Sequence, residues 1–180
     1  MKVHIDDIPE AGRDLHYHWK EGKLRQFMPP DDPFEIEMVE PIEVNLRISK
    51  KTDHLRVQGE LRACLRLSCH RCLGHFQQQL QPPIDTVLMH APATPEDEEV
   101  ELDAEELDTT FFDGEEIDID HLVAEELFLA LPFQVLCKEE CKGLCPGCGA
   151  NLNLEPCRCE RGVSASPFAS LQLLKGRLNQ

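Results

Sequence analysis

The sequence predicts an α+β protein: an antiparallel β-sheet or small barrel with a few short helices, followed by a C-terminal cysteine-rich, zinc-binding segment. Three observations predict this fold class. Apolar and polar residues alternate with a period of two through much of residues 34–90, as in strands that bury one face. A stretch after residue 119 changes to helical spacing. Six cysteines then fall within residues 137–159, which favours metal or thiol chemistry in a reducing compartment.

The clearest predicted strand covers residues 55–67, where apolar residues stand at 55, 57, 61, 63, 65 and 67 with polar residues between them. Two shorter alternating runs precede it, FEIEM at 34–38 and VNLRI at 44–48. Two more follow it on either side of Pro82 and Pro83, FQQQL at 76–80 and IDTVLMH at 84–90. About five strands result, which is enough for an antiparallel sheet or a small barrel.

We divide the chain into three parts: an N-terminal segment at 1–33, a β core at 34–135, and a zinc-knuckle segment with a terminal helix at 136–180. The core contains an acidic loop at 92–116 and a helix at 120–131. Asp118 or Asp120 is the expected N-cap of that helix, and Pro132 ends it. The terminal helix is expected to begin at Ser166 and Pro167.

The run HYHW at 16–19 contains two histidines, and we interpret it as a partly packed strand rather than a metal site.

The charge of the chain is concentrated in one stretch. The net charge is −16, and residues 96–120 carry 14 acids with no lysine or arginine. We interpret the acidic loop as solvated, with an acidic arm that contacts a basic partner as the alternative. A protein with so much negative charge is not expected to bind phosphate groups strongly and without specificity.

The polar face of the long predicted strand is a candidate surface for RNA or for a protein partner. It carries Arg56, Arg62 and Arg66 and is extended by Arg71, although a solvated face is an equal alternative.

The six clustered cysteines follow the spacing C-x3-C-x3-C-x2-C-x8-C-x-C. Zinc takes four ligands in a tetrahedron, so six thiols exceed one site. We favour Cys145, Cys148 and Cys159, with Cys141 or Cys157 as the fourth ligand. Alternatively, Cys69 and Cys72 join Cys137 and Cys141 in a second site. The candidate zinc ligands are therefore Cys137, Cys141, Cys145, Cys148, Cys157 and Cys159.

Two other kinds of thiol chemistry compete with structural zinc. Cys145 and Cys148 have the spacing of a redox dithiol, but the residues that follow them favour a turn over a helix that would lower a thiol pKa. An iron–sulfur cluster is the second competitor. The chain contains no G-x-G-x-x-G, P-loop or G-x-S-x-G motif, so we expect a protein that is not an enzyme.

Four segments, taken in order, resemble one known family. These are SCHRCLGHF at 68–76, EEIDIDHLVAEELFLALPFQVLC at 115–137, CKGLCPGCGANLN at 141–153 and SPFASLQLLK at 166–175. Together they resemble the YceD family, the large ribosomal RNA subunit accumulation proteins. The resemblance covers residues 34 to the end and implies a bacterial, non-enzymatic factor that supports accumulation of 23S ribosomal RNA and of the large subunit.

The resemblance also implies ribosomal RNA or ribosome-assembly proteins as partners. The N-terminal residues contain no apolar stretch typical of a secretory signal, and no run is long enough to span a membrane. We therefore expect a cytoplasmic protein with no membrane partner and no small-molecule substrate. The alternative functions are a protein–protein interaction module that uses the acidic arm or the terminal helix, and a thiol oxidoreductase.

Overall fold

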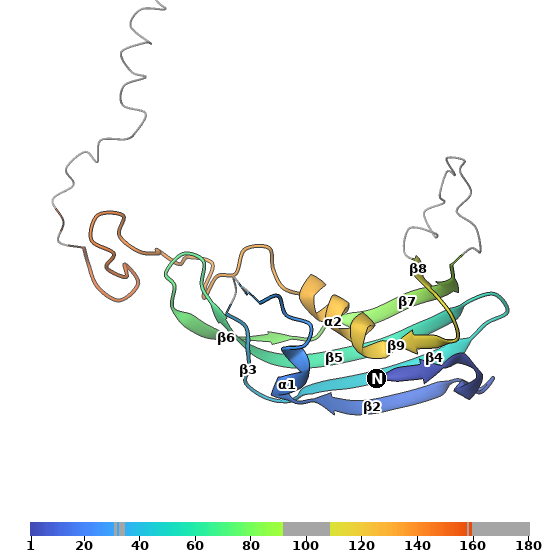
Figure 1. The fold of residues 1–180 in the computed structure, drawn as a ribbon. Helices are drawn as coiled ribbons and strands as arrows, with labels where there is room; N and C mark the ends of the chain where they lie inside the picture. Colours follow the sequence, from blue (N-terminus) through green and yellow to red (C-terminus); the bar gives the residue numbers. More distant parts are fainter. Residues whose placement is uncertain (31, 33–34, 92–108, 158, 160–180) are drawn as a thin grey trace, which may run out of the picture.

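The computed structural model describes residues 1–30, 32, 35–91, 109–157 and 159. The fold is α+β, as predicted, because strands dominate and two short α-helices accompany them (Figure 1). The elements are β1 (Lys2–His4), η1 (Ile5–Asp7), β2 (Arg13–Trp19), α1 (Glu21–Leu24), β3 (Glu37–Met38), β4 (Ile42–Lys50), β5 (Leu55–Ser68), β6 (His75–Leu80), β7 (Pro83–His90), β8 (Thr109–Phe112), β9 (Glu116–Asp118) and α2 (Ile119–Leu129).

Strand β5 is the centre of the sheet because its 14 residues are long enough to pair with two strands along each edge. On one edge, Leu55–Arg62 pairs with β4, and β3 pairs further along, near Leu65. On the other edge, β7 pairs with Leu55–Glu60 and β6 with Ala63–Ser68. The changes of partner fall at Pro41 and Pro82, where proline lacks the N–H that a continuous ladder needs.

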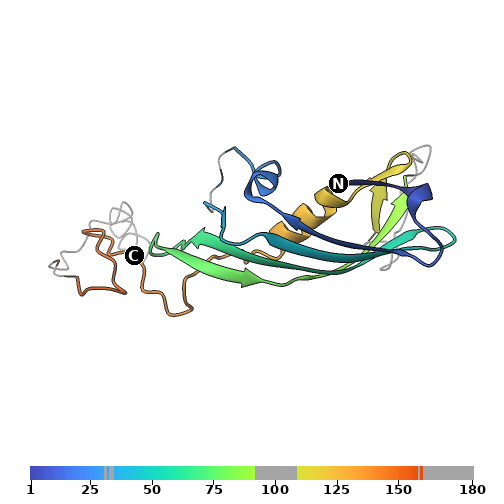
Figure 2. The same cartoon turned by 90° about the horizontal axis from the view of Figure 1, so that it is seen from below.

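The sheet is open rather than closed into the small barrel that the sequence also allowed. Its strand order is β2-β4-β5-β7-β8, with β3 and β6 as further partners of β5. All pairs are antiparallel except β7 with β8, which is parallel. Strands β1 and β9 form a separate two-stranded sheet. In side view the large sheet is one curved layer, and α1, α2 and the β1–β9 pair lie on one face of it (Figure 2).

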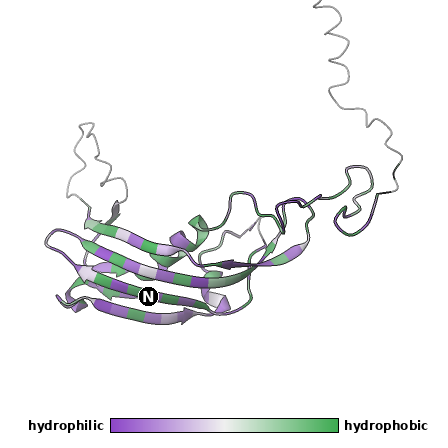
Figure 3. Ribbon diagram, turned by 180° about the vertical axis from the view of Figure 1, so that it is seen from behind, coloured by the Kyte–Doolittle hydropathy of each residue, from purple (hydrophilic) through white to green (hydrophobic). Residues whose placement is uncertain are grey.

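The predicted alternation places one face of β5 in the core. Val57, Leu61 and Leu65 are fully buried, and hydrophobic and hydrophilic residues alternate along the strands in Figure 3. Helix α2 covers this core with its buried residues Val123 and Leu127. Burial of such apolar side chains is the main favourable term that holds helix and sheet together.

Helix α2 begins after Asp118, one of the two predicted N-cap residues. The Asp118 side chain accepts hydrogen bonds from the backbone N–H groups of Asp120 and His121, so Asp118 is the N-cap. Asp120 is buried instead, where it accepts a hydrogen bond from Trp19 Nε1 at 3.1 Å and pairs with Lys23 Nζ at 2.5 Å. The helix covers 119–129 rather than the predicted 120–131, so it ends before Pro132.

Gly59 permits the close approach of β4 to β5. Its φ is +156°, and a Cβ at this position would lie 2.0 Å from the backbone oxygen of Asn45. No side chain fits there without separating the strands. The alternating pattern alone did not reveal this requirement, since a glycine inside a strand has several possible explanations.

Some of the predicted elements differ from those in the structure, and others fall on residues that the structure does not describe. Within the strand expected at 34–38, the structure has a strand only at Glu37–Met38 among the described residues 35–38, and residue 34 lies outside them. Within the stretch predicted as an acidic loop, Thr109–Phe112 forms β8, whose Thr and Phe residues favour strands. Residues 92–108 and the expected terminal helix lie outside the described residues. Among the described helices, none has the length and apolar character needed to cross a membrane.

Candidate metal centres

The turn between β5 and β6 brings the first two cysteines together. The backbone N–H of Cys69 donates to Gly74 O at 3.0 Å, and that of Leu73 donates to Cys69 O at 2.8 Å. Leu73 adopts a positive φ of 55°, which turns the chain back toward β6. This tight turn brings the Sγ atoms of Cys69 and Cys72 within 4.8 Å of each other, which a C-x2-C pair needs in order to share an ion.

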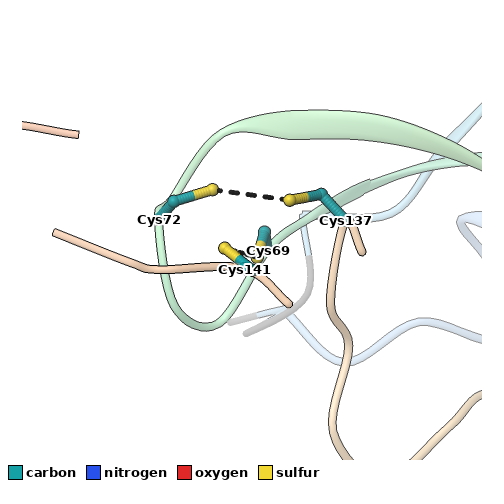
Figure 4. Close-up of side chains that lie close together, drawn as sticks. All are labelled: Cys69, Cys72, Cys137 and Cys141. Carbon is teal, nitrogen blue, oxygen red and sulfur yellow. Dashed lines mark hydrogen bonds between the residues drawn. The ribbon is translucent and has the colours of Figure 1, made fainter. Parts of the chain in front are cut away.

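The segment that follows α2 brings two more cysteines to this turn. It is attached to the turn by the backbone N–H of His70, which donates to Val135 O at 2.9 Å. Arg71 also donates from its guanidinium Nη1 to Cys141 O at 3.1 Å. Cys137 and Cys141 consequently face the cysteines of the β5–β6 turn (Figure 4) and pack against them in one apolar cluster.

These four thiols form a compact group, which we call the buried centre: Cys69, Cys72, Cys137 and Cys141. The Sγ atoms of Cys69 and Cys141 are 3.8 Å apart, as are those of Cys72 and Cys137. Four sulfurs bound at about 2.3 Å around one tetrahedral ion lie about 3.8 Å from one another. The spacing therefore fits a single ion.

A second group of four thiols follows directly in the chain, and we call it the exposed centre: Cys145, Cys148, Cys157 and Cys159. The Sγ of Cys157 lies 3.1 Å from that of Cys145 and 3.6 Å from that of Cys148. Backbone N–H groups point at the sulfurs, from Gly147 to Cys145 at 3.4 Å and from Cys159 to Cys157 at 3.2 Å. In each centre all four ligand atoms lie within 4.8 Å of one another, so either could hold a metal ion.

Electrostatics within each centre favour a bound cation. Burial alone would raise the pKa of Cys69, but backbone N–H groups, those of Cys137 and Cys72 foremost, lower the pKa to about 6. The pKa of Cys137 rises to about 12, through burial and hydrogen bonds with the neighbouring sulfurs. In the exposed centre, hydrogen bonds from Cys157 and then from backbone N–H groups lower the pKa of Cys145 to about 6. In the buried centre the pKa values of Cys69 and Cys141 are thus lowered and those of Cys72 and Cys137 raised. A divalent cation would stabilise all four thiolates by displacing the remaining protons.

The structure divides the six predicted ligands between two centres. Cys145, Cys148 and Cys159 lie together, and of the two alternatives for the fourth member the structure places Cys157 beside them. Cys141 lies in the other group, with Cys137 and the two cysteines of the β5–β6 turn, which is the arrangement considered as a second site. The signal for this second group was the excess of two thiols over one tetrahedral site, together with a C-x2-C pair at a strand end. The ninth cysteine, Cys64, is in neither group.

The pair Cys145 and Cys148 lacks the local structure of a redox dithiol. Residues 146–148 form a turn, and no helix begins there. A redox C-x-x-C pair normally sits at a helix N-terminus, which stabilises the thiolate. Both sulfurs instead approach the same third sulfur, that of Cys157, which is the geometry of a ligand group.

The arginine-bearing strand face is balanced by acids. Arg56 binds Asp85 through two hydrogen bonds, at 2.7 and 2.8 Å. Arg62 pairs with Glu60 at 2.7 Å and Arg66 with Glu37 at 2.6 Å. Arg71 is engaged with backbone carbonyls beside the buried centre. The three arginines of β5 therefore offer little unpaired positive charge to a phosphate backbone, whereas Arg71 retains its charge.

Comparison with known proteins places this arrangement in a family. The sequence model described as "Large ribosomal RNA subunit accumulation protein YceD" matches residues 57–175. The chain belongs to the YceD family. The matched range begins within β5 and contains both centres, so the family match covers the part of the fold that positions all eight clustered thiols.

Curated relatives agree with the family model. An Arabidopsis thaliana protein named large ribosomal RNA subunit accumulation protein YCED homolog 1, chloroplastic, is 26% identical over 161 residues, or 78% of this chain and 50% of the relative. The Zea mays protein of the same name is 26% identical over 147 residues, or 67% of this chain and 49% of the relative. A Mycobacterium tuberculosis protein named as uncharacterized is 30% identical over 115 residues, or 64% of this chain and 53% of the relative. The chain thus spans about half the length of these relatives, and no solved structure matches it significantly.

Proposed function

We propose that this protein supports the accumulation of large-subunit ribosomal RNA, 23S rRNA in a bacterium, and thereby of the large ribosomal subunit. The observation that carries this proposal is the family match over residues 57–175. That range contains most of the central strand β5, helix α2 and both thiol centres, so it covers the elements that position the thiols. The names of the two plant relatives point to the same role.

We further propose that the role is non-enzymatic. The acids Glu125 and Glu126 are neighbours on α2, and adjacent helical residues point in different directions. Glu126 accepts a hydrogen bond from Thr86 Oγ1 at 3.2 Å, which favours a packing role. The cysteines occur as ligand-like groups of four rather than as a nucleophile beside a base.

Each centre is proposed to hold one structural zinc ion. Four thiolates in a tetrahedral arrangement are a common structural zinc site. An iron–sulfur cluster distributes its cysteines over more than one iron and therefore needs a larger separation of sulfurs than a single ion does. The separations in both centres, from 3.1 to 3.8 Å where they are measured, favour a single ion.

Metal analysis of protein purified without added zinc tests the cofactor. We expect about two zinc ions per chain, with one lost on serine substitution of any of the eight clustered cysteines. Cys64→Ser is the matched control and should retain both ions. Iron in place of zinc would refute the choice of metal, and metal-free protein with unchanged stability would refute metal binding.

Depletion of the protein in the organism that encodes it tests the function. We expect a lower ratio of large- to small-subunit ribosomal RNA and a smaller large-subunit peak in sucrose gradients, both restored by the wild-type chain. The Cys72→Ser/Cys137→Ser variant should restore neither, whereas Cys64→Ser should restore both. A normal ratio and a normal subunit profile after depletion would refute the proposal.

We propose that the working partner is a precursor of the large subunit, bound through ribosomal RNA or through an assembly protein. Because the arginines of the strand face are paired with acids, we do not assign RNA contact to that face. Affinity purification with and without nuclease separates the two modes of attachment. Retention of large-subunit assembly proteins after nuclease indicates a protein contact, and loss of them indicates an RNA contact. Capture of proteins unrelated to the ribosome would favour the general interaction module instead.

A further inference from the structure

Asn153 belongs to one thiol centre by sequence and contacts the other in space. It lies in the loop between Cys148 and Cys157, two members of the exposed centre. Its side-chain Nδ2 nevertheless donates to the Sγ of Cys141, in the buried centre, at 3.3 Å. The side chain therefore connects the loop between two members of the exposed centre to a sulfur of the buried centre.

The orientation of the Asn153 amide is determined by its surroundings. The backbone N–H of Lys142 points at Asn153 Oδ1 from 2.9 Å, and a backbone N–H can only donate. The Oδ1 atom must therefore face Lys142, which leaves the NH₂ group for Cys141. The same NH₂ group donates to Asn151 Oδ1 at 2.9 Å. Contacts to both Oδ1 and Nδ2 of the Asn153 amide thus keep the Nδ2 donor directed at the Cys141 sulfur.

The short connection between the centres is also packed against the buried one. The backbone N–H of Leu144 donates to Arg71 O at 3.1 Å, and Arg71 stands between Cys69 and Cys72. Gly143 has a φ of +70°, and a Cβ there would lie 2.9 Å from the same Arg71 oxygen. Only glycine fits this conformation and this approach without strain.

We propose that the two metal centres are energetically coupled through Asn153, so that occupancy of the exposed centre raises the metal affinity of the buried centre. This inference rests on the metal binding proposed above. Metal at the exposed centre ties Cys148 to Cys157 and restricts the loop between them. The conformational entropy that Asn153 must lose to reach Cys141 is then already lost. The amide donor in turn stabilises negative charge on the Cys141 sulfur.

The expected size of the coupling follows from the behaviour of groups that hydrogen-bond to metal ligands. Loss of such a group typically weakens metal binding by about 10–100-fold. Coupling between two binding sites is also reciprocal, so occupancy of the buried centre must raise the affinity of the exposed centre by the same factor. Asn153 is a positioning residue in this scheme, because it acts on the metal through Cys141.

Cadmium NMR of the full chain during titration with a competing chelator measures the two centres separately. Each signal is assigned by its disappearance in Cys148→Ser/Cys157→Ser or in Cys72→Ser/Cys137→Ser. Asn153→Asp keeps an oxygen for Lys142 but lacks the donor toward Cys141, and Asn153→Ala lacks both. Both substitutions should weaken the buried centre by about 10–100-fold. Asn45→Ala on β4, whose side chain contacts His16, is the matched control and should have no effect.

Non-additivity decides between coupling and a merely local effect. Loss of the exposed centre should itself weaken the buried centre, and Asn153→Ala should add little in that background. Two independent losses that multiply, or no loss in either variant, would overturn the coupling while leaving metal binding intact. Absence of both cadmium signals in the wild type would instead refute the metal proposal. Fluorescence of Trp19, the single tryptophan and a buried one, verifies that the β core of each variant is folded.

Discussion

Removal of the proposed zinc ions should unfold residues 136–159 and leave the sheet intact. Among the described residues of this segment only Cys141 and Gly143 are buried, and Leu136, Cys137 and Leu144 are partly buried against the thiols. Hydrophobic burial therefore contributes only a few kcal/mol, at about 1.5–3 kcal/mol for each fully buried apolar side chain. Ordering its backbone costs at least ~1 kcal/mol per residue, or about 24 kcal/mol in all. The apparent binding free energy of a structural zinc ion, about 10–16 kcal/mol, already includes the cost of ordering the chain around it, so two ions would keep the segment folded. Without them the segment has no comparable source of stability.

Hydrogen exchange read by mass spectrometry measures this effect by segment. The backbone N–H groups of Cys145, Gly149 and Leu152 donate to the carbonyl oxygens of Ala150, Cys145 and Gly143, respectively. With metal bound, these groups should exchange slowly. After chelation they should exchange at the rate of an unfolded chain, while β5 stays protected. Trypsin should then cleave after Lys142. Retained protection of the three amides in metal-free protein would refute the reasoning, because burial would then suffice to hold the segment.

Three further predictions concern the β core and the odd cysteine. Gly59→Ala should lower the free energy of unfolding by about 2–4 kcal/mol in urea titrations, because a Cβ would force β4 from β5 and break ladder hydrogen bonds; unchanged stability would contradict the close approach. Asp120→Ala should cost about 2–3 kcal/mol because it leaves Lys23 without its carboxylate. Burial would raise the pKa of Asp120, but hydrogen bonds from Lys23 and its other donors outweigh burial and lower it. Its contribution is therefore present above the unfolded pKa of about 3.9 and is lost as pH falls through the lower folded pKa, so Asp120→Asn should flatten the acid limb of stability against pH. Cys64→Ser should leave metal content unchanged by mass spectrometry, and loss of an ion would mean that a ninth thiol binds metal.

The parts of the fold that the sequence predicted are those that depend on local patterns. The alternation around Leu61 is produced by the two-residue repeat of a strand, and the structure confirms it along β5. The N-cap at Asp118 was one of two predicted positions, because capping needs only a short acceptor at a helix start. By contrast, the need for Gly59 depends on the distance to a neighbouring strand, which no local pattern contains.

The arginine-bearing strand face is another case in which local sequence patterns do not reveal contacts between distant residues. Arg56 and Arg66 are visible as a polar stripe in the sequence, and their acids stand far from them along the chain. Asp85 is on β7 and Glu37 on β3, each brought alongside β5 by strand pairing. The sequence therefore predicted that these arginines share one strand face. It did not predict that acids on neighbouring strands would pair with them.

For the thiol centres, the sequence by itself determined the supply of ligands and the turns that hold them. Cys145 and Cys148 are three residues apart, and their shared direction follows from one tight turn. Only the tertiary structure decided how eight thiols divide into two groups of four. Cys72 and Cys137 are 65 residues apart, and they meet because the turn after β5 lies against the chain that leaves α2. Which thiols lie together is thus a property of packed strands and helices, because distance in space is set by the fold and not by spacing along the chain.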